Sequence, residues 1–200
     1  MSPRPDVSEE RKSQILEAAK KIFSKLGFHK ARMSDIAQEA DLSKGSIYWY
    51  FKSKDDVIIS LLDRIFIAEL RNLQPLIDSE ASAMERLIAY TDCVISDMET
   101  TMKWMPLAYD FLALAFRRDT VQMALCKYYR AHMNTLTPII QQGIDSGEFA
   151  APNAEDATIA LSALVEGIAL LWVYDPENIN IEKHIRSSVQ LLLDGLKTHC

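Results

Sequence analysis

The chain has 200 residues, enough for one or two domains with a sizeable core, and its 48% hydrophobic content excludes disorder by composition. Only 6 glycines and 7 prolines occur, which argues against an all-β fold because such folds need many tight turns. Residues 1–54 carry 11 Lys/Arg and 7 Asp/Glu, a charge of +4, whereas residues 55–200 carry 11 and 21, a charge of −10. An acidic body repels DNA, so any contact with nucleic acid has to come from the basic head.

Apolar residues recur at helical spacing nearly throughout, so the sequence predicts an all-α protein of about nine helices. The first helix begins after Ser8, buries an apolar stripe and ends at Gly27. Two short helices, SDIAQEA and KGSIYWYF, follow and are joined by the turn DLS. The next helix is capped by Ser53, with an acidic partner three residues later, and is expected to end before Pro75.

The remaining helices are predicted near residues 81–102, 106–117, 119–146, 153–174 and 180–198, with breaks at Pro106 and at the turn sequences DSGEFAAPN and YDPEN. The most apolar stretch, 159–174, contains Glu166 and is too short to span a bilayer, so we expect a buried helix and no membrane contact. The N-terminal MSPRPDVSEER lacks the apolar region of a signal peptide, so we expect a cytoplasmic protein.

Two short helices joined by three residues, between longer helices, form the helix-turn-helix plan, whose second helix enters the DNA major groove. On that second helix, Ile47 and Phe51 are four residues apart and share the inward face, so Tyr48, Trp49 and the lysines point outward. Lysines neutralise phosphates, tyrosine hydroxyls bind phosphate oxygens, and flat apolar faces contact thymine methyl groups. This segment therefore predicts a DNA-reading surface.

The stretch SDIAQEADLSKGSIYWYFKSKDDVI resembles the DNA-binding domain of the TetR (tetracycline-repressor) family of bacterial transcription regulators, most specifically in the run SKGSIYWYFKSK. The resemblance covers residues 8–60 and continues through the all-helical remainder. It implies a DNA-binding helix-turn-helix domain at 1–53 and a ligand-binding and dimerisation domain at 54–200. By position it implies DNA contacts from Arg32, Ser34, Lys44, Gly45, Ser46, Tyr48, Trp49, Tyr50 and Lys54.

Asp41 departs from the family pattern, because it occupies the turn position where the family usually has glycine. Aspartate tolerates the left-handed conformation better than most residues, so we expect the turn to survive. Its negative charge close to DNA is expected to weaken non-specific binding.

The resemblance also implies a homodimer that reads a palindromic operator and pairs its last two helices with their copies. Apolar stripes on those helices favour an interface made of Leu161, Leu164, Val165, Ile168, Trp172, Ile185, Val189, Leu192 and Leu196, although one stripe could instead pack inside the subunit.

Flexible sulfurs and flat rings in the middle helices favour a pocket for a small, largely hydrophobic effector, although for any single residue an ordinary core is the better interpretation. The predicted lining is Met98, Met102, Trp104, Met105, Tyr109, Met123, Tyr129 and Met133. An unpaired carboxylate facing the pocket, from Asp92, Asp97, Asp110 or Glu166, would make the effector cationic, because a buried charge needs a partner.

No catalytic signature, metal-ligand spacing or cofactor motif is recognisable in the sequence, so we expect neither an enzyme nor a metal site. The sequence thus predicts a repressor that its effector releases from DNA. Three alternatives stay open: an adaptor that kept the shape and lost DNA binding, an enzyme without a signature, and a thiol sensor that uses Cys93 or Cys126 on the same DNA-binding head.

Overall fold

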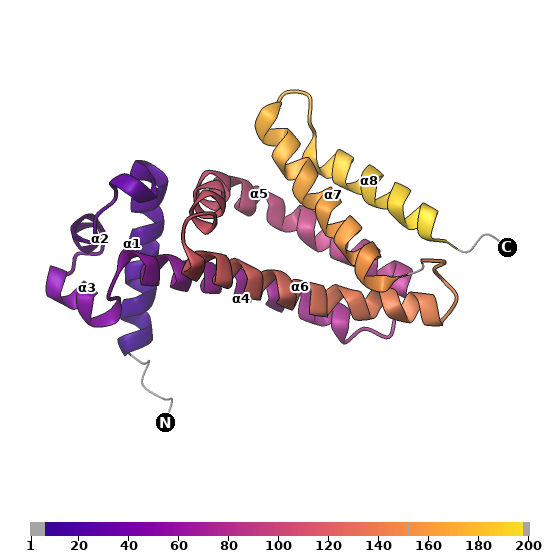
Figure 1. The fold of residues 1–200 in the computed structure, drawn as a ribbon, viewed down its shortest axis with the longest axis horizontal. Helices are drawn as coiled ribbons and strands as arrows, with labels where there is room; N and C mark the ends of the chain where they lie inside the picture. Colours follow the sequence, from indigo (N-terminus) through magenta and orange to yellow (C-terminus); the bar gives the residue numbers. More distant parts are fainter. Residues whose placement is uncertain (1–6, 152, 198–200) are drawn as a thin grey trace. The chain divides into compact units, whose positions relative to one another are not determined.

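The computed structural model describes residues 7–151 and 153–197, apart from the side chains of residues 7, 65, 66, 69 and 99–106. The described chain is helical and holds no strand, only an isolated bridge between Phe149 and Lys197, so the predicted all-α class is confirmed. The helices in Figure 1 are α1 (Val7–Lys30), α2 (Met33–Glu39), α3 (Lys44–Tyr50), α4 (Lys54–Ile77), α5 (Ala83–Ala115), α6 (Asp119–Asp145), α7 (Ala154–Tyr174) and α8 (Ile181–Leu196).

Polar side chains fix the helix starts where the sequence predicts them. The Ser43 hydroxyl accepts the N–H of Ser46 at 3.0 Å at the start of α3. Ser53 and Asp56 exchange hydrogen bonds, each with the other's main-chain N–H, at 3.1 Å at the start of α4. These caps satisfy N–H groups that have no partner inside the helix. Gly27, with φ 71°, interrupts α1 near its end, as expected of a glycine at a helix terminus.

Two predicted helix ends are wrong, and both involve proline. α4 continues through Pro75 to Ile77, and α5 is one helix over Ala83–Ala115 with no break at residue 106. α6 likewise contains Pro138. A proline removes one main-chain hydrogen bond and tends to bend a helix, but packing on both sides can hold the helix together across it.

The chain forms two compact units. The first comprises residues 1–68 and 101–128, and the second comprises residues 69–100 and 129–200. In the first unit the inward residues of α1, α2 and α3, such as Phe23, Ile36 and Ile47, share one core with Phe111 and Val121. Residues 107–124 therefore pack with the helix-turn-helix, although they lie far from it in sequence. Leu26 is exposed next to the interruption of α1 at Gly27.

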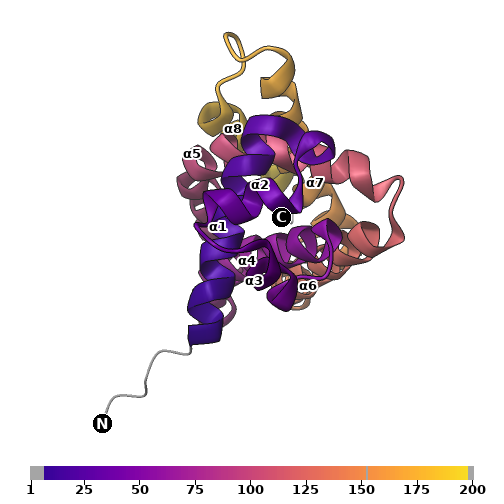
Figure 2. The same ribbon diagram turned by 90° about the vertical axis from the view of Figure 1, so that its left-hand side faces the viewer.

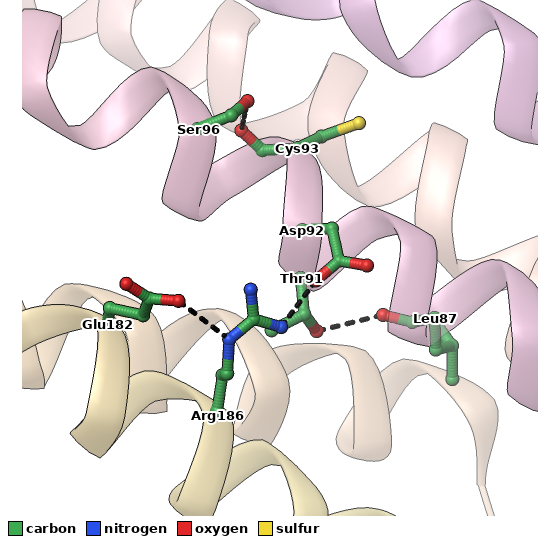
Figure 3. A network of polar contacts seen from close by, with 7 residues as sticks. All are labelled: Leu87, Thr91, Asp92, Cys93, Ser96, Glu182 and Arg186. Carbon is green, nitrogen blue, oxygen red and sulfur yellow. Dashed lines mark hydrogen bonds and ion pairs between the residues drawn. The ribbon is translucent and has the colours of Figure 1, made fainter.

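The second unit is held together by apolar packing and by arginines that join its helices. Arg86 is buried and donates to the carbonyl oxygens of Leu76 and Ile77, which end α4. Arg186 on α8 pairs with Asp92 on α5 and with Glu182 on its own helix, as Figure 3 shows. Free carbonyls at a helix end favour a cationic donor, so Arg86 stabilises the junction between α4 and α5.

Candidate nucleic-acid interface

The start of α2 carries two of the predicted contact residues. Arg32 occupies the N-cap position, and its main-chain N–H donates to the Asp35 carboxylate at 2.9 Å. Ser34 is exposed in the first turn of the helix rather than at the cap. Both side chains are open to solvent beside a helix N-terminus, where N–H groups favour an anion such as phosphate.

The turn between α2 and α3 has the geometry that the helix-turn-helix plan requires. Asp41 adopts φ 51°, so the expectation that it tolerates the left-handed conformation is confirmed. The N–H of Leu42 donates to the Ala37 carbonyl at 2.9 Å and closes the turn. The turn is thus held on the end of α2 by a main-chain hydrogen bond, and the buried apolar sides of the two short helices belong to one core.

α3 presents one apolar and one mixed face, in the predicted phase. Ile47 and Phe51 are buried, whereas Tyr48 is 40% and Trp49 is 79% exposed. We use the term reading surface for the exposed residues of this segment: Lys44, Gly45, Tyr48, Trp49 and Lys52. Figure 2 turns α1, α2 and α3 toward the viewer. The reading surface combines cations with flat rings, which suits contact with phosphates and bases.

The other three predicted contacts on α3 and α4 are less open. Ser46 is half-buried, and its hydroxyl lies 2.8 Å from that of Ser43. Tyr50 is half-buried and packs against the core of the first unit. The ammonium group of Lys54 is directed at main-chain oxygens near the end of α1, with Nζ 2.8 Å from the Ala31 carbonyl oxygen.

Comparison with known proteins decides the family. Residues 15–61 match the family described as bacterial regulatory proteins, tetR family, and residues 83–197 match the C-terminal domain of BetI-type transcriptional repressors. The chain belongs to the TetR family of transcriptional regulators. It is a helix-turn-helix DNA-binding regulator and not an enzyme.

One relative and several solved structures are similar over most of the chain. The HTH-type transcriptional regulator YfiR of Bacillus subtilis is 30% identical over 165 residues, covering 80% of this chain and 78% of that protein. A protein described as a transcriptional regulator from Saccharomonospora viridis, solved with choline, superposes with a TM-score of 0.83 at 19% identity, covering 96% and 100% of the two chains. The regulator FadR from Bacillus subtilis, solved with stearoyl-CoA, gives 0.76 at 23%, covering 92% and 98%.

The predicted effector-lining residues of this TetR-family chain fall into separate groups. Met98 and Met133 are buried in the second unit, and Tyr109 is half-buried in the first. Met123 is 70% and Tyr129 is 42% exposed. The side chains of the other three, Met102, Trp104 and Met105, lie outside the described residues.

Three of the four acidic candidates already have partners: Asp92 pairs with Arg186, Asp97 accepts from Asn72, and Asp110 accepts from the N–H of Phe28. Glu166 has no hydrogen bond or ion pair with any residue that the structure describes. Its side chain is exposed as a whole, yet the protein around the carboxyl group desolvates it and raises its pKa. Among these four, Glu166 is therefore the carboxylate available to a cation.

The predicted dimer residues also divide. Leu161, Ile168, Ile185 and Val189 are buried inside the second unit, and the other five, Leu164, Val165, Trp172, Leu192 and Leu196, are half-buried. The exposed apolar side chains of α7 and α8 are instead Ile159, Leu170, Leu171, Val173, Tyr174 and Leu191. Sequence periodicity cannot tell which apolar side of a doubly apolar helix faces its own subunit, so it did not separate these exposed residues from the buried ones.

α7 is long and apolar enough, by length and composition alone, to cross a membrane. The argument from shortness is therefore wrong, because residues 159–174 belong to a helix of 21 residues. The same property is met by core helices of proteins that cross no membrane.

The chemistry at Cys93 favours a structural role over reactivity. Burial, together with Asp97 and Asp92, raises the pKa of the Cys93 thiol, which disfavours the reactive thiolate. Among the described residues, no three His, Cys, Asp or Glu side chains are grouped to hold a metal ion.

Proposed function

We propose that this TetR-family regulator is a ligand-responsive repressor whose dimer binds a palindromic operator and is released by a small effector. The observation that carries the proposal is the reading surface, where Trp49 is 79% exposed beside Tyr48 and two lysines. Exposing an aromatic pair to water is unfavourable unless it contacts a partner. Bases and phosphates are the partners that this combination of groups fits best.

The roles of individual residues follow from their placement. Tyr48, Trp49 and Lys44 lie against base edges and groove walls, and Gly45 admits the backbone close to the DNA because it has no Cβ. Lys52 and Tyr50 bind phosphates at the edge of the groove. The α2 pair, Arg32 and Ser34, adds backbone contacts, and Ser46 contributes through its hydroxyl network with Ser43.

Dimerisation is proposed to use the exposed apolar faces of α7 and α8. Tyr174 is 71% and Leu191 is 75% exposed, and Leu170 and Ile159 lie on the same outer side of α7. A second copy would cover these side chains, with the half-buried Leu164 and Trp172 at the edge of the contact. Two copies double the DNA contacts and match a palindrome whose half-sites are about one helical turn, or a small multiple of it, apart.

The effector is proposed to be small and largely hydrophobic, with Glu166 as the carboxylate that could accept a cationic group. The buried Met98 and Met133 support an adaptable apolar lining, whereas the exposed Met123 and Tyr129 are poorer candidates. The structural neighbours with choline and with stearoyl-CoA indicate that the fold accepts both cations and long acyl chains.

The proposed mechanism is a shift between two populations. Effector binding in the 54–200 domain favours a state in which the two 1–53 heads no longer match the half-sites, so the dimer leaves the operator. Such a regulator acts on DNA in the cytoplasm.

The test is selection of short genomic fragments by the purified protein, followed by binding measurements on the enriched sequence. We expect one palindrome, with Tyr48→Ala weakening its binding about tenfold or more. Phe116→Ala is the matched control, because Phe116 is an aromatic side chain that is 91% exposed outside α3 and should not matter. If no sequence is enriched, the adaptor alternative replaces this proposal.

The effector part has a separate test. Decyltrimethylammonium and decanol share one alkyl chain and differ in charge, and Trp172 on α7 offers a fluorescence signal for their binding. We expect the cation to bind more tightly and to release DNA, and Glu166→Gln to remove that preference. Equal binding of both probes to the unaltered protein would remove the cationic option.

A further inference from the structure

Lys54 stands at the first position of α4, and its ammonium group is occupied by the protein itself. Nζ lies 2.5 Å from the carbonyl oxygen of Phe28, 2.8 Å from that of Ala31 and 3.5 Å from that of His29. A lysine ammonium has three N–H donors. The two closer carbonyl oxygens and the more distant one of His29 therefore engage the ammonium, and a phosphate would have to displace one of these contacts.

The oxygens that Lys54 binds belong to the end of α1 and the residues after it. Gly27 adopts φ 71°, so the helix is interrupted there and the following carbonyls lack regular helical partners. A cation at this end also interacts favourably with the helix dipole. The ammonium lies 4.1 Å from the centre of the Phe28 ring, which adds a cation–π contact.

Two further residues complete the site from the α5–α6 corner. Asp110 accepts the main-chain N–H of Phe28 at 3.4 Å. Arg118 lies 5.6 Å from the centre of the Phe28 ring and forms an ion pair with Asp55, the neighbour of Lys54. Partial burial, followed by the positive charge of Arg118, lowers the pKa of Lys54.

The start of α4 links the reading surface on α3 to the end of α1. α3 leads into α4 through residues 51–53, and the Asp56 carboxylate accepts the N–H groups of Lys52 and Ser53 at this connection. Lys54 then joins the start of α4 to the end of α1. The C-terminal end of α3 is thus tied to α1 by a short series of hydrogen bonds, and the tie passes through the Lys54 ammonium.

On the basis of the proposed function, we infer that Lys54 is a positioning residue that holds α3 in place on the DNA-binding domain. We infer also that it makes no contact with DNA phosphate. This assigns Lys54 a role different from the one that the family resemblance implies. Lys52, two residues earlier, is exposed, and its ammonium has a single main-chain contact at 3.4 Å, so it is the phosphate ligand of this pair.

The experiment compares Lys54→Ala with Lys52→Ala on the operator and on random DNA, over about 50 to 200 mM salt. Losing a phosphate contact lowers the slope of log affinity against log salt by about one and weakens binding to all sequences alike. We expect this result for Lys52→Ala. For Lys54→Ala we expect an unchanged slope, unchanged binding to random DNA, and about tenfold loss of preference for the operator.

Lys54→Arg provides a second test in case Lys54→Ala unfolds. It retains the positive charge and changes only the geometry of the donors. A guanidinium fork cannot direct three donors at converging carbonyls as an ammonium does, so we expect loss of operator preference at unchanged slope. A reduced slope for Lys54→Ala, or full operator preference for Lys54→Arg, would overturn the inference. If neither the unaltered protein nor Lys52→Ala prefers any DNA sequence, the proposed function fails instead.

Discussion

Phe28 and Asp110 are joined by a hydrogen bond from the main-chain N–H of the first to the carboxylate of the second, although 82 positions separate them in sequence. The Phe28 side chain is buried, so its N–H has little access to water. An unpaired N–H in such a place is costly, and the carboxylate on α5 removes that cost. The end of α1 therefore depends on a residue that the sequence assigns to a different domain.

Asp110→Ala is expected to lower the free energy of unfolding by about 1 to 2 kcal/mol, because it leaves the Phe28 N–H without its acceptor. Asp110→Asn is the control, since its amide oxygen can still accept the bond. Urea unfolding of both variants measures the difference. Equal stability of the two variants would show that the bond contributes nothing.

Replacing Asp41 affects stability and DNA binding in different ways. Asp41 has φ 51°, so Asp41→Ala should destabilise the protein by about 1 kcal/mol, whereas Asp41→Gly relieves the conformational cost. Asp41→Gly also removes a negative charge beside α3 and should raise affinity for random DNA. Thermal unfolding and binding to a random duplex are the two measurements. Unchanged or weaker random-DNA binding by Asp41→Gly would contradict the electrostatic part.

Leu191→Glu is expected to dissociate the dimer, because Leu191 is 75% exposed on α8 and a charge there would be buried against the second copy. Phe116→Glu is the matched control, since it places the same charge at an exposed apolar position outside α7 and α8. Sedimentation equilibrium measures both. A dimeric Leu191→Glu protein, or a monomeric Phe116→Glu protein, would point to another interface.

The stability of the second unit should depend on pH through His132. Burial lowers the pKa of this histidine below its ordinary 6.5, and its Nε2 lies 3.2 Å from the Tyr90 hydroxyl. The unfolded chain takes up the proton first as the pH falls, so stability is complete above the ordinary value and declines below it.

His132→Gln removes the titrating group while keeping polar atoms near Tyr90. Its loss of stability between about pH 8 and about pH 5.5 should be smaller than that of the unaltered protein. Urea midpoints at the two pH values provide the measurement. A variant with the same pH dependence as the unaltered protein would show that other groups cause it.

Much of the structure of residues 1–53 was predictable from local chemistry. Ser43, Ser53 and Asp41 act on main-chain atoms within a few residues, so their caps and turn follow from sequence spacing alone. The four-residue interval between Ile47 and Phe51 set the phase of α3, and with it the exposed Tyr48 and Trp49.

For residues 54–200 the all-α class was predictable, whereas several helix ends and exposed helix faces were not. Helix ends at Pro75 and Pro106 were wrong because tertiary packing, which the sequence does not display, decides whether a helix continues through a proline. The exposed apolar face of α7 was missed for a related reason. A helix that is apolar on nearly every side has no periodic signal to distinguish its inner face from its outer one.

The sequence by itself determined the all-α class, the helix-turn-helix and the residues of its reading surface, because each depends on contacts within one helix or one turn. Only the tertiary structure decided the contacts of Lys54, Asp110 and Arg118. All three side chains contact the turn at residues 27–31, and spacing along the chain cannot reveal this proximity. A charged side chain acts on whatever the fold brings within a few ångströms of it, and for these residues the fold brought main-chain oxygens, an N–H group and a buried ring.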